Sequence, residues 1–236
     1  MTTIDVRPPE TRFHTQIDWL DSHHAFSFGH HHDPGNTNHG LLLVLNDDKV
    51  RAGTGFGMHP HRDMEIVTWV LSGKLEHRDS EGNYGLIYPG LAQRMSAGTG
   101  IRHSEFNPDP DVDVHFLQMW VPPDTNGIAP GYEQKDVQQL LATGELVAVA
   151  SGQGHAGAIT IHQRDAVLWV GRLAGDKQVD VPPAGHVHVY IARGSGRLGE
   201  HALVTGAAAR LTEVAEGDLT FTAGPEGAEV VVWATA

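Results

Sequence analysis

The sequence predicts an all-β protein, built as a sandwich or barrel of short strands. Glycine (28 residues) and proline (13 residues) recur along the whole 236-residue chain. Between them lie short apolar stretches rich in Val, Ile, Leu and Trp. Turn-forming residues that alternate with β-branched runs are typical of all-β folds. A chain of this length can form one large β domain or two small ones.

The expected strands are short β-branched or aromatic runs bounded by turn residues. They are residues 41–45, 65–71, 115–121, 166–173, 186–192 and 230–233. One helix is expected, over residues 134–141. There, apolar residues at 137, 140 and 141 interrupt a polar segment, and Gly144 follows as a stop signal.

A domain boundary is expected just before this helix. Residues 121–131 contain three prolines and two glycines and show no hydrophobic periodicity. We therefore predict two β domains, residues 1–130 and residues 131–236.

A weak internal repeat supports this division. His59-Pro-His61 precedes an apolar strand in the first half, and His186-Val-His188 precedes one in the second. Duplication of one β module is the simplest explanation, with the second copy having lost its chemistry.

Composition excludes several classes of function. There is no cysteine, so a disulfide framework, a Cys-ligated zinc or iron–sulfur site and a thiol nucleophile are excluded. The formal charge of -13 repels phosphate backbones and anionic lipids, which argues against direct binding of nucleic acid or membranes. Without a secretory signal or a long apolar segment, the protein is expected to be cytoplasmic.

Two pairs of polar residues predict a metal site. His59 and His61 are two residues apart and therefore project from the same face of a strand, and so do His103 and Glu105. If the strands are neighbours, three imidazoles and one carboxylate surround one ion. Such donors suit Fe(II), Mn(II), Ni(II), Cu(II) or Zn(II) and leave coordination positions open for catalysis.

The same segments carry a family resemblance. The chain resembles the pirin-like branch of the cupin superfamily, and most of all the bacterial pirin-like quercetin dioxygenases, over roughly residues 15–135. The matching segments are Leu45-Asn-Asp-Asp48, Ala52-Gly-Thr-Gly-Phe-Gly-Met-His-Pro-His61-Arg62 with Glu65 and Gly73, Glu76-His-Arg-Asp-Ser80, Tyr88-Pro-Gly90, Met95-Ser-Ala-Gly-Thr-Gly-Ile-Arg-His103-Ser-Glu105 and Tyr132-Glu-Gln-Lys135.

The resemblance implies a bicupin, with two cupin-type β-barrel or jelly-roll domains and one short connecting helix. It also implies one divalent transition metal in the N-terminal domain, in the first place Fe(II), with Mn, Co, Ni, Cu or Zn as alternatives. The ligands carried over by position are His59, His61, His103 and Glu105. The second domain is expected to lack a metal, because no His-x-Glu pair follows His186 and His188.

The implied activity is opening of the ring of a flavonol such as quercetin by dioxygen, with release of carbon monoxide. A metal acidifies the flavonol 3-hydroxyl, and the resulting enolate can react with dioxygen. Glu105 is the candidate base. Glu65 is expected to share the strand face of His59 and His61 if the strand runs straight, as a second base or as a partner that orients an imidazole.

Two other functions remain open from the sequence. One is a non-enzymatic, redox-responsive iron protein that binds a protein partner, and the other is a small-molecule isomerase. The chain is expected to be a monomer.

Several further signals receive structural interpretations. The run His30-His31-His32 is interpreted as a loop at the barrel mouth, and the G-x-G-x-x-G pattern at 194–199 as a β turn. The single histidines 77, 115 and 162 are interpreted as structural. Trp69, Trp120 and Trp169 are interpreted as core residues, with Trp69 able to face the pocket.

Overall fold

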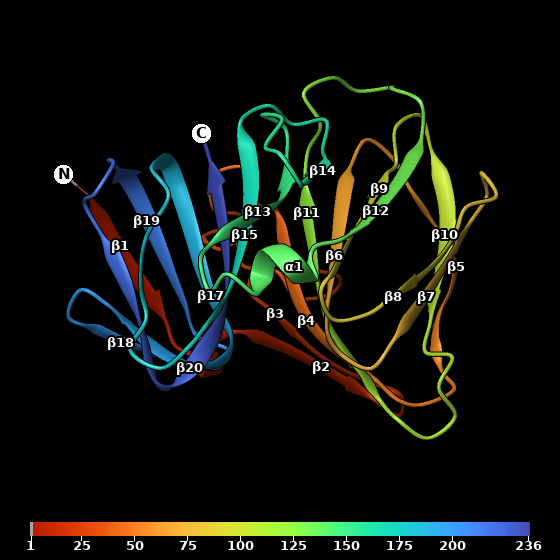
Figure 1. Ribbon diagram of the computed structural model, residues 1–236. Helices are drawn as coiled ribbons and strands as arrows, with labels where there is room; N and C mark the ends of the chain where they lie inside the picture. The colour runs from red at the N-terminus through yellow and green to blue at the C-terminus, as the bar shows by residue number, and fades with distance from the viewer. Residues whose placement is uncertain (1) are drawn as a thin grey trace.

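The computed structural model describes residues 2–236, and in that range the strands form three sheets (Figure 1). The seven-stranded sheet contains, in spatial order, β12 (Gly131–Asp136), β9 (Leu91–Ser96), β6 (Glu65–Ser72), β11 (Val114–Val121), β4 (Val44–Val50), β3 (Leu20–His24) and β2 (Phe13–Ile17). The four-stranded sheet contains β5 (Gly55–His61), β10 (Ile101–Phe106), β7 (Leu75–Asp79) and β8 (Tyr84–Ile87).

The C-terminal half forms a nine-stranded sheet. Its main path is β1 (Thr3–Arg7), β19 (Ala208–Val214), β17 (Ala184–Leu198), β20 (Thr220–Thr235), β15 (Ala166–Leu173), β13 (Val147–Ser151) and β14 (Ile159–Thr160). Two short strands attach to it, β16 (Gln178–Asp180) on β20 and β18 (His201–Val204) on β17. The predicted all-β class is confirmed, and each expected strand from residue 65 onward coincides with or lies within an observed one.

The largest apolar core lies between the two halves. It joins Val67, Trp69 and Met119 of the seven-stranded sheet to Leu168 and Trp233 of the nine-stranded sheet. Separate clusters fill the space between the four- and seven-stranded sheets and the interior of the C-terminal sheet. The N-terminal barrel thus consists of two sheets packed face to face. Its seven-stranded sheet also packs on the C-terminal barrel.

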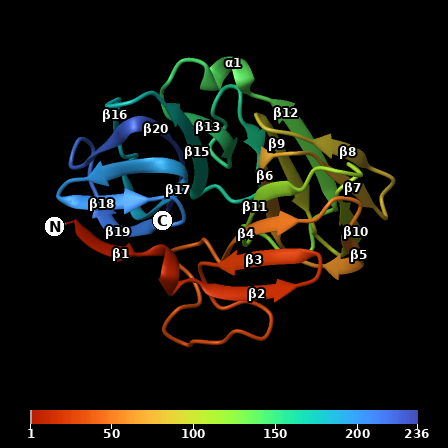
Figure 2. The same cartoon turned by 90° about the horizontal axis from the view of Figure 1, so that it is seen from below.

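Strands are exchanged across the expected boundary at residue 130. β1 pairs with β19 of the C-terminal sheet, and Figure 2 shows it lying beside the C-terminal strands. Conversely, β12 pairs with β9 of the N-terminal sheet. A division of the chain near residue 130 stays a prediction, but the sheets do not separate cleanly there.

The expected helix over residues 134–141 is shorter in the structure. α1 comprises Gln138–Leu141, and a 3-10 turn, η1, covers Pro9–Thr11. Residues 134–136 instead continue β12, where Gln134 lies opposite Gln93 of β9. Pairing with a neighbouring strand outweighs the helical pattern of the local sequence. None of the helices within residues 2–236 has the length and apolar character needed to cross a membrane.

β4 starts and ends later than expected, at Val44 and Val50 rather than at 41 and 45. Its second half carries Asn46 and Asp48, which are buried polar residues. An apolar run in the sequence ends at such polar residues. The strand nevertheless continues, because β4 is paired with β11 along its length and its buried polar side chains line a cavity.

Candidate metal centre

The four-stranded sheet brings three histidines together. β5 and β10 are antiparallel, and His59 lies directly opposite His103. The ring centroids of His59 and His103 are 4.4 Å apart, and each is 4.9 Å from that of His61. One nitrogen from each ring falls within 4.8 Å of the others. The two strands thus bring the three histidines to one point, and their role as metal ligands stays a prediction.

The free nitrogens of this cluster suit a metal ion. His59 Nδ1 lies 2.7 Å from the carbonyl oxygen of Gly57, so Nδ1 carries the proton and donates it. The lone pair of Nε2 therefore remains free to bind a metal. The Nε2 atoms of His61 and His103 are buried and have no hydrogen-bond partner within the described chain. Buried polar atoms are rarely left unpaired, since doing so costs about 1–3 kcal/mol each. A divalent cation bound at this point would pair with the Nε2 atoms of all three histidines.

The imidazoles of His61 and His103 are neutral near pH 7, as metal ligands must be. Burial, with the neighbouring His59 as the next cause, lowers the pKa of His61 to about 4. The same two causes, in the same order, lower the pKa of His103 to about 2.

A second layer of residues fixes His103. Its Nδ1 lies 3.4 Å from Nδ1 of His77, and His77 Nε2 lies 3.0 Å from the carboxylate of Asp79. Burial lowers the pKa of His77, so this ring is neutral. A neutral His77 that donates from Nε2 to Asp79 must accept at Nδ1, and His103 therefore donates from Nδ1 and keeps Nε2 free. His77 is structural, as expected, but it also sets the tautomer of a candidate ligand.

Glu105 lies beside the histidine cluster without belonging to it. Among residues 2–236, the group whose ligand atoms lie within 4.8 Å of one another contains the three histidines and not Glu105. A β-bulge separates His103 from Glu105, and both carboxylate oxygens accept from Gln118 Nε2, at 2.8 and 2.7 Å. Burial raises the pKa of Glu105 to about 7, against the effect of the Gln118 hydrogen bonds. Ligation by Glu105 stays a prediction.

Glu65 does not share a strand face with His59 and His61. The chain turns after His61, with Asp63 at a positive φ of 47°, and Glu65 begins β6 in the other sheet. Its carboxylate accepts from Ser96 Oγ and from the backbone nitrogen of His162, both at 2.9 Å. The expectation of a straight strand was wrong, and Glu65 instead ties the N-terminal barrel to a loop of the C-terminal half.

A cavity of about 280 Å³ opens next to the cluster. The residues lining it are Thr15, Leu20, Ser22, His24, Phe28, Gly29, His30, Asn46, Asp48, Phe56, His59, His61, Glu105, Gln118 and Trp120. This volume is at the small end of ligand pockets. The expectation that the 30–32 loop lines the barrel mouth is confirmed for His30.

Aromatic rings form the apolar walls of the cavity. Trp120 packs edge-on against His61, with centroids 5.0 Å apart, and Phe28 packs edge-on against Trp120 at 5.6 Å. Trp120 was expected in the core but lies in the pocket. Trp69 is fully buried between the halves, where its Nε1 donates to Glu229 at 2.9 Å. A planar aromatic ligand suits such walls.

The polar groups of β4 that line the cavity were not found from the sequence. Asp48 is buried and accepts from Ser22 Oγ. Burial raises the pKa of Asp48 to about 8, the Ser22 hydrogen bond opposes this, and the charge of Glu105 adds to it. The resemblance included the segment with Asp48, but nothing in the local pattern distinguished it from a surface acid.

The second histidine pair lies in the C-terminal half. His186 donates from Nδ1 to the backbone oxygen of Ala236 at 2.9 Å, and its ring packs edge-on against that of His39. His188 is buried, and neither of its nitrogens has a partner in the described chain.

This fold and site define a class: a two-domain cupin with a histidine cluster on the cavity of its N-terminal barrel. Comparison with family models agrees. Residues 7–121 match the pirin model and residues 148–232 match the quercetinase C-terminal cupin domain. The chain belongs to the pirin family.

Similar proteins include bacterial relatives and solved structures. A Mycobacterium tuberculosis protein provisionally named quercetin 2,3-dioxygenase is 49% identical over 233 residues, covering 98% of this chain and 94% of that protein. The Escherichia coli quercetin 2,3-dioxygenase is 45% identical over 175 residues, 74% of each protein. The crystal structure of YhhW from Escherichia coli has a TM-score of 0.90 at 35% identity, over 99% of this chain and 98% of that one. A nickel(II) complex of the same bacterial pirin has a TM-score of 0.87.

Proposed function

We propose that the protein is a metal-dependent dioxygenase that opens the ring of a flavonol such as quercetin, with release of carbon monoxide. The observation that carries this proposal is the placement of three imidazoles, two with unpaired buried Nε2 atoms, at the wall of an aromatic-lined cavity. The names of the relatives and the nickel-bound neighbour support it.

His59, His61 and His103 are the proposed ligands, with Glu105 as the fourth after it leaves Gln118. A divalent metal held there, Fe(II) in the first place, would supply a Lewis acid for the flavonol 3-hydroxyl and leave coordination positions open. Gln118 is positioned to control Glu105, since its amide holds both carboxylate oxygens.

The chain's own groups then bind and orient the substrate. Phe28 and Trp120 contact the flat faces and edges of the flavonol rings. Asp48 and Asn46, which also line the cavity, offer polar atoms to the ring hydroxyls. Glu105 takes the proton of the 3-hydroxyl, because its carboxylate lines the same cavity as His59 and His61.

The test is turnover of quercetin by protein loaded separately with Fe, Mn, Co, Ni, Cu and Zn. Loss of the flavonol absorbance together with release of about one carbon monoxide per flavonol is the expected result. His61→Ala, loaded in parallel, is the matched negative. Metal binding without turnover for every ion would overturn the dioxygenase proposal and leave the histidine site intact.

A further inference from the structure

The β2–β3 hairpin has two chemically different faces. In its antiparallel register, His14 lies opposite His23, Thr15 opposite Ser22 and Gln16 opposite Asp21. Thr15 and Ser22 line the cavity. Because side chains alternate across a strand, His14, Asp21 and His23 project from the other face.

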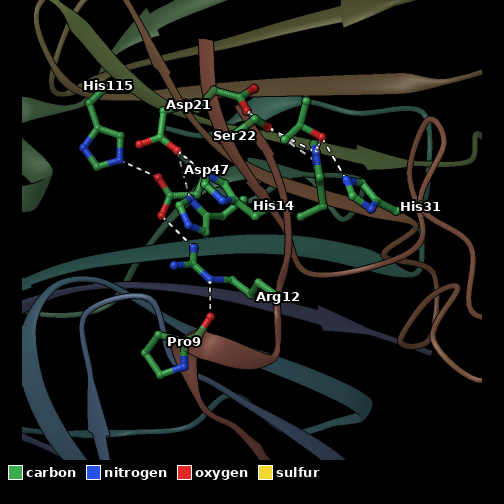
Figure 3. Close-up of polar contacts among 12 residues, drawn as sticks. Pro9, Arg12, His14, Asp21, Ser22, His31, Asp47 and His115 are labelled. Atoms are coloured by element: carbon green, nitrogen blue, oxygen red, sulfur yellow. Dashed lines mark hydrogen bonds and ion pairs between the residues drawn. The ribbon is translucent and has the colours of Figure 1, made fainter. Parts of the chain in front are cut away.

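These three side chains form a compact cluster, of which Figure 3 labels His14 and Asp21. His14 Nε2 lies 2.8 Å from Asp21 Oδ1, and His23 Nδ1 lies 3.7 Å from the same oxygen. The two imidazole rings stack, with centroids 4.3 Å apart and an angle of 14° between their planes. One ligand atom from each residue falls within 4.8 Å of the others.

We propose that the outer face of this hairpin is a second, separate site for a borderline divalent metal such as Zn(II), Ni(II) or Cu(II). Two imidazole nitrogens and one carboxylate oxygen are the donors these ions prefer. The side chains are 34–43% exposed, so water can complete the coordination sphere. The set comes from two strands, which are held in register by the sheet and not by the metal.

Charged groups surround the cluster. The guanidinium of Arg12 pairs with Asp47 at 2.9 Å. In β4, Asp47 lies directly opposite His23 and bonds to His115, and the exposed Lys49 lies opposite Asp21. The cluster therefore borders the Arg12–Asp47 ion pair and one exposed lysine, in a chain whose net charge of -13 favours cation binding.

Binding here has a structural consequence for the cavity. β2 is the edge strand of its sheet, paired with β3 alone. A metal between His14 and the two β3 ligands cross-links the two strands, whose inner face is one wall of the cavity. Edge hairpins are the elements most prone to local opening, so the cross-link holds this wall in place.

Calorimetric titration of the metal-free protein with Zn(II) tests the proposal. The wild type is expected to bind two ions and His61→Ala one. In the His61→Ala background, His14→Ala and Asp21→Asn should each weaken the remaining site by more than about tenfold, the lower end seen when even an indirect partner of a ligand is lost. His32→Ala removes an exposed imidazole outside the cluster and is the matched control, expected to have no effect.

Hydrogen exchange gives an independent readout. Zn(II) should slow exchange of the amides of 13–24 in His61→Ala and leave them unchanged in His61→Ala/His14→Ala. Equal Zn(II) binding by these two variants would overturn the second site. This result is distinct from failure of the proposed function, which concerns the wild-type activity and the ion lost in His61→Ala.

Discussion

His103 Nδ1 lies 3.4 Å from Nδ1 of His77, and Asp79 holds the opposite nitrogen of His77 at 3.0 Å. All three groups are buried, and His77 and Asp79 belong to β7, the strand that pairs with the strand of His103, β10. This arrangement fixes which nitrogen of His103 faces the histidine cluster. Residues that orient a ligand in this way tune metal affinity without touching the metal.

We therefore expect His77→Leu to weaken metal binding by about 10- to 100-fold, the range for loss of such a partner. Leucine keeps the buried volume but cannot accept from His103. Competition with a chelator measures the affinity, and the visible spectrum of the Co(II) form reports any change in ligand geometry. Glu76→Gln, on the other face of β7, is the control. An unchanged affinity and spectrum in His77→Leu would contradict the positioning role.

The location of the principal metal can be tested with one histidine from each half. His61→Ala is expected to lower metal occupancy and activity together, because it removes a proposed ligand. His188→Ala is expected to leave the metal content per folded protein nearly unchanged, since His188 lies beneath Phe26 in the C-terminal half. Elemental analysis of folded, gel-filtered protein measures both. Equal metal loss in the two variants would refute a single N-terminal centre at the cavity.

Asp48 predicts a pH dependence of stability. The ordinary pKa of this carboxyl is 3.8, and in the folded protein burial raises the pKa to about 8 because it disfavours the charged form. Between these values the folded state holds the extra proton, so this group makes the free energy of unfolding fall as pH rises. The slope for one proton is up to about 1.4 kcal/mol per pH unit.

Asp48→Asn removes that slope while keeping an acceptor for Ser22. The measurement is urea unfolding of the metal-free wild type and variant between about pH 5 and about pH 7. The advantage of the variant over the wild type should grow with pH. Glu81→Gln, at an exposed acid, is the control, and parallel curves for Asp48→Asn and wild type would rule out the raised pKa.

Trp120 is expected to govern substrate affinity. Trp120→Ala removes the ring that contacts both His61 and Phe28. Aromatic pairs are worth about 0.5–1.5 kcal/mol beyond the area they bury, which corresponds to a roughly 2- to 12-fold rise in KM for a flavonol. Trp120→Phe should recover most of this loss. A fall in kcat with KM unchanged would place Trp120 outside the binding site.

Local spacing was enough to identify the three histidines as candidates, because the period of a strand is two and His59 and His61 are an i, i+2 pair. His103 was identified from its own i, i+2 pair with Glu105, although a β-bulge separates these two residues and Glu105 lies outside the cluster. The cavity wall was not predictable in this way. Asp48 lies in β4 and Trp120 lies in β11. These two strands pair with each other although they are far apart in the sequence. Which face of such a strand meets the cavity depends on tertiary pairing, and Trp120 reads as a core residue when only its apolar neighbours are considered.

The incorrect prediction for Glu65 also arises from tertiary structure that local spacing does not reveal. The parity of Glu65 with His59 and His61 holds only for an unbroken strand, and the positive φ of Asp63 marks a turn into another sheet. Arg62 and Asp63 are polar, as many exposed strand residues are, so the sequence does not distinguish the turn from a continuing strand. The helix was overestimated because β9, which captures residues 131–136, lies some forty residues earlier in the chain.

Glu65 and Glu105 should therefore respond differently to truncation. Glu65→Ala leaves Ser96 Oγ and the His162 backbone nitrogen without their acceptor, which costs about 1–3 kcal/mol for each donor left unpaired. It is expected to lower the free energy of unfolding, measured in urea, and to leave the metal content of the folded protein unchanged. Glu105→Ala is expected to weaken metal binding, because it removes the proposed fourth ligand. If folded Glu65→Ala lost as much metal as Glu105→Ala, Glu65 would have to be assigned to the metal centre. This result would contradict its role as a link between the two barrels.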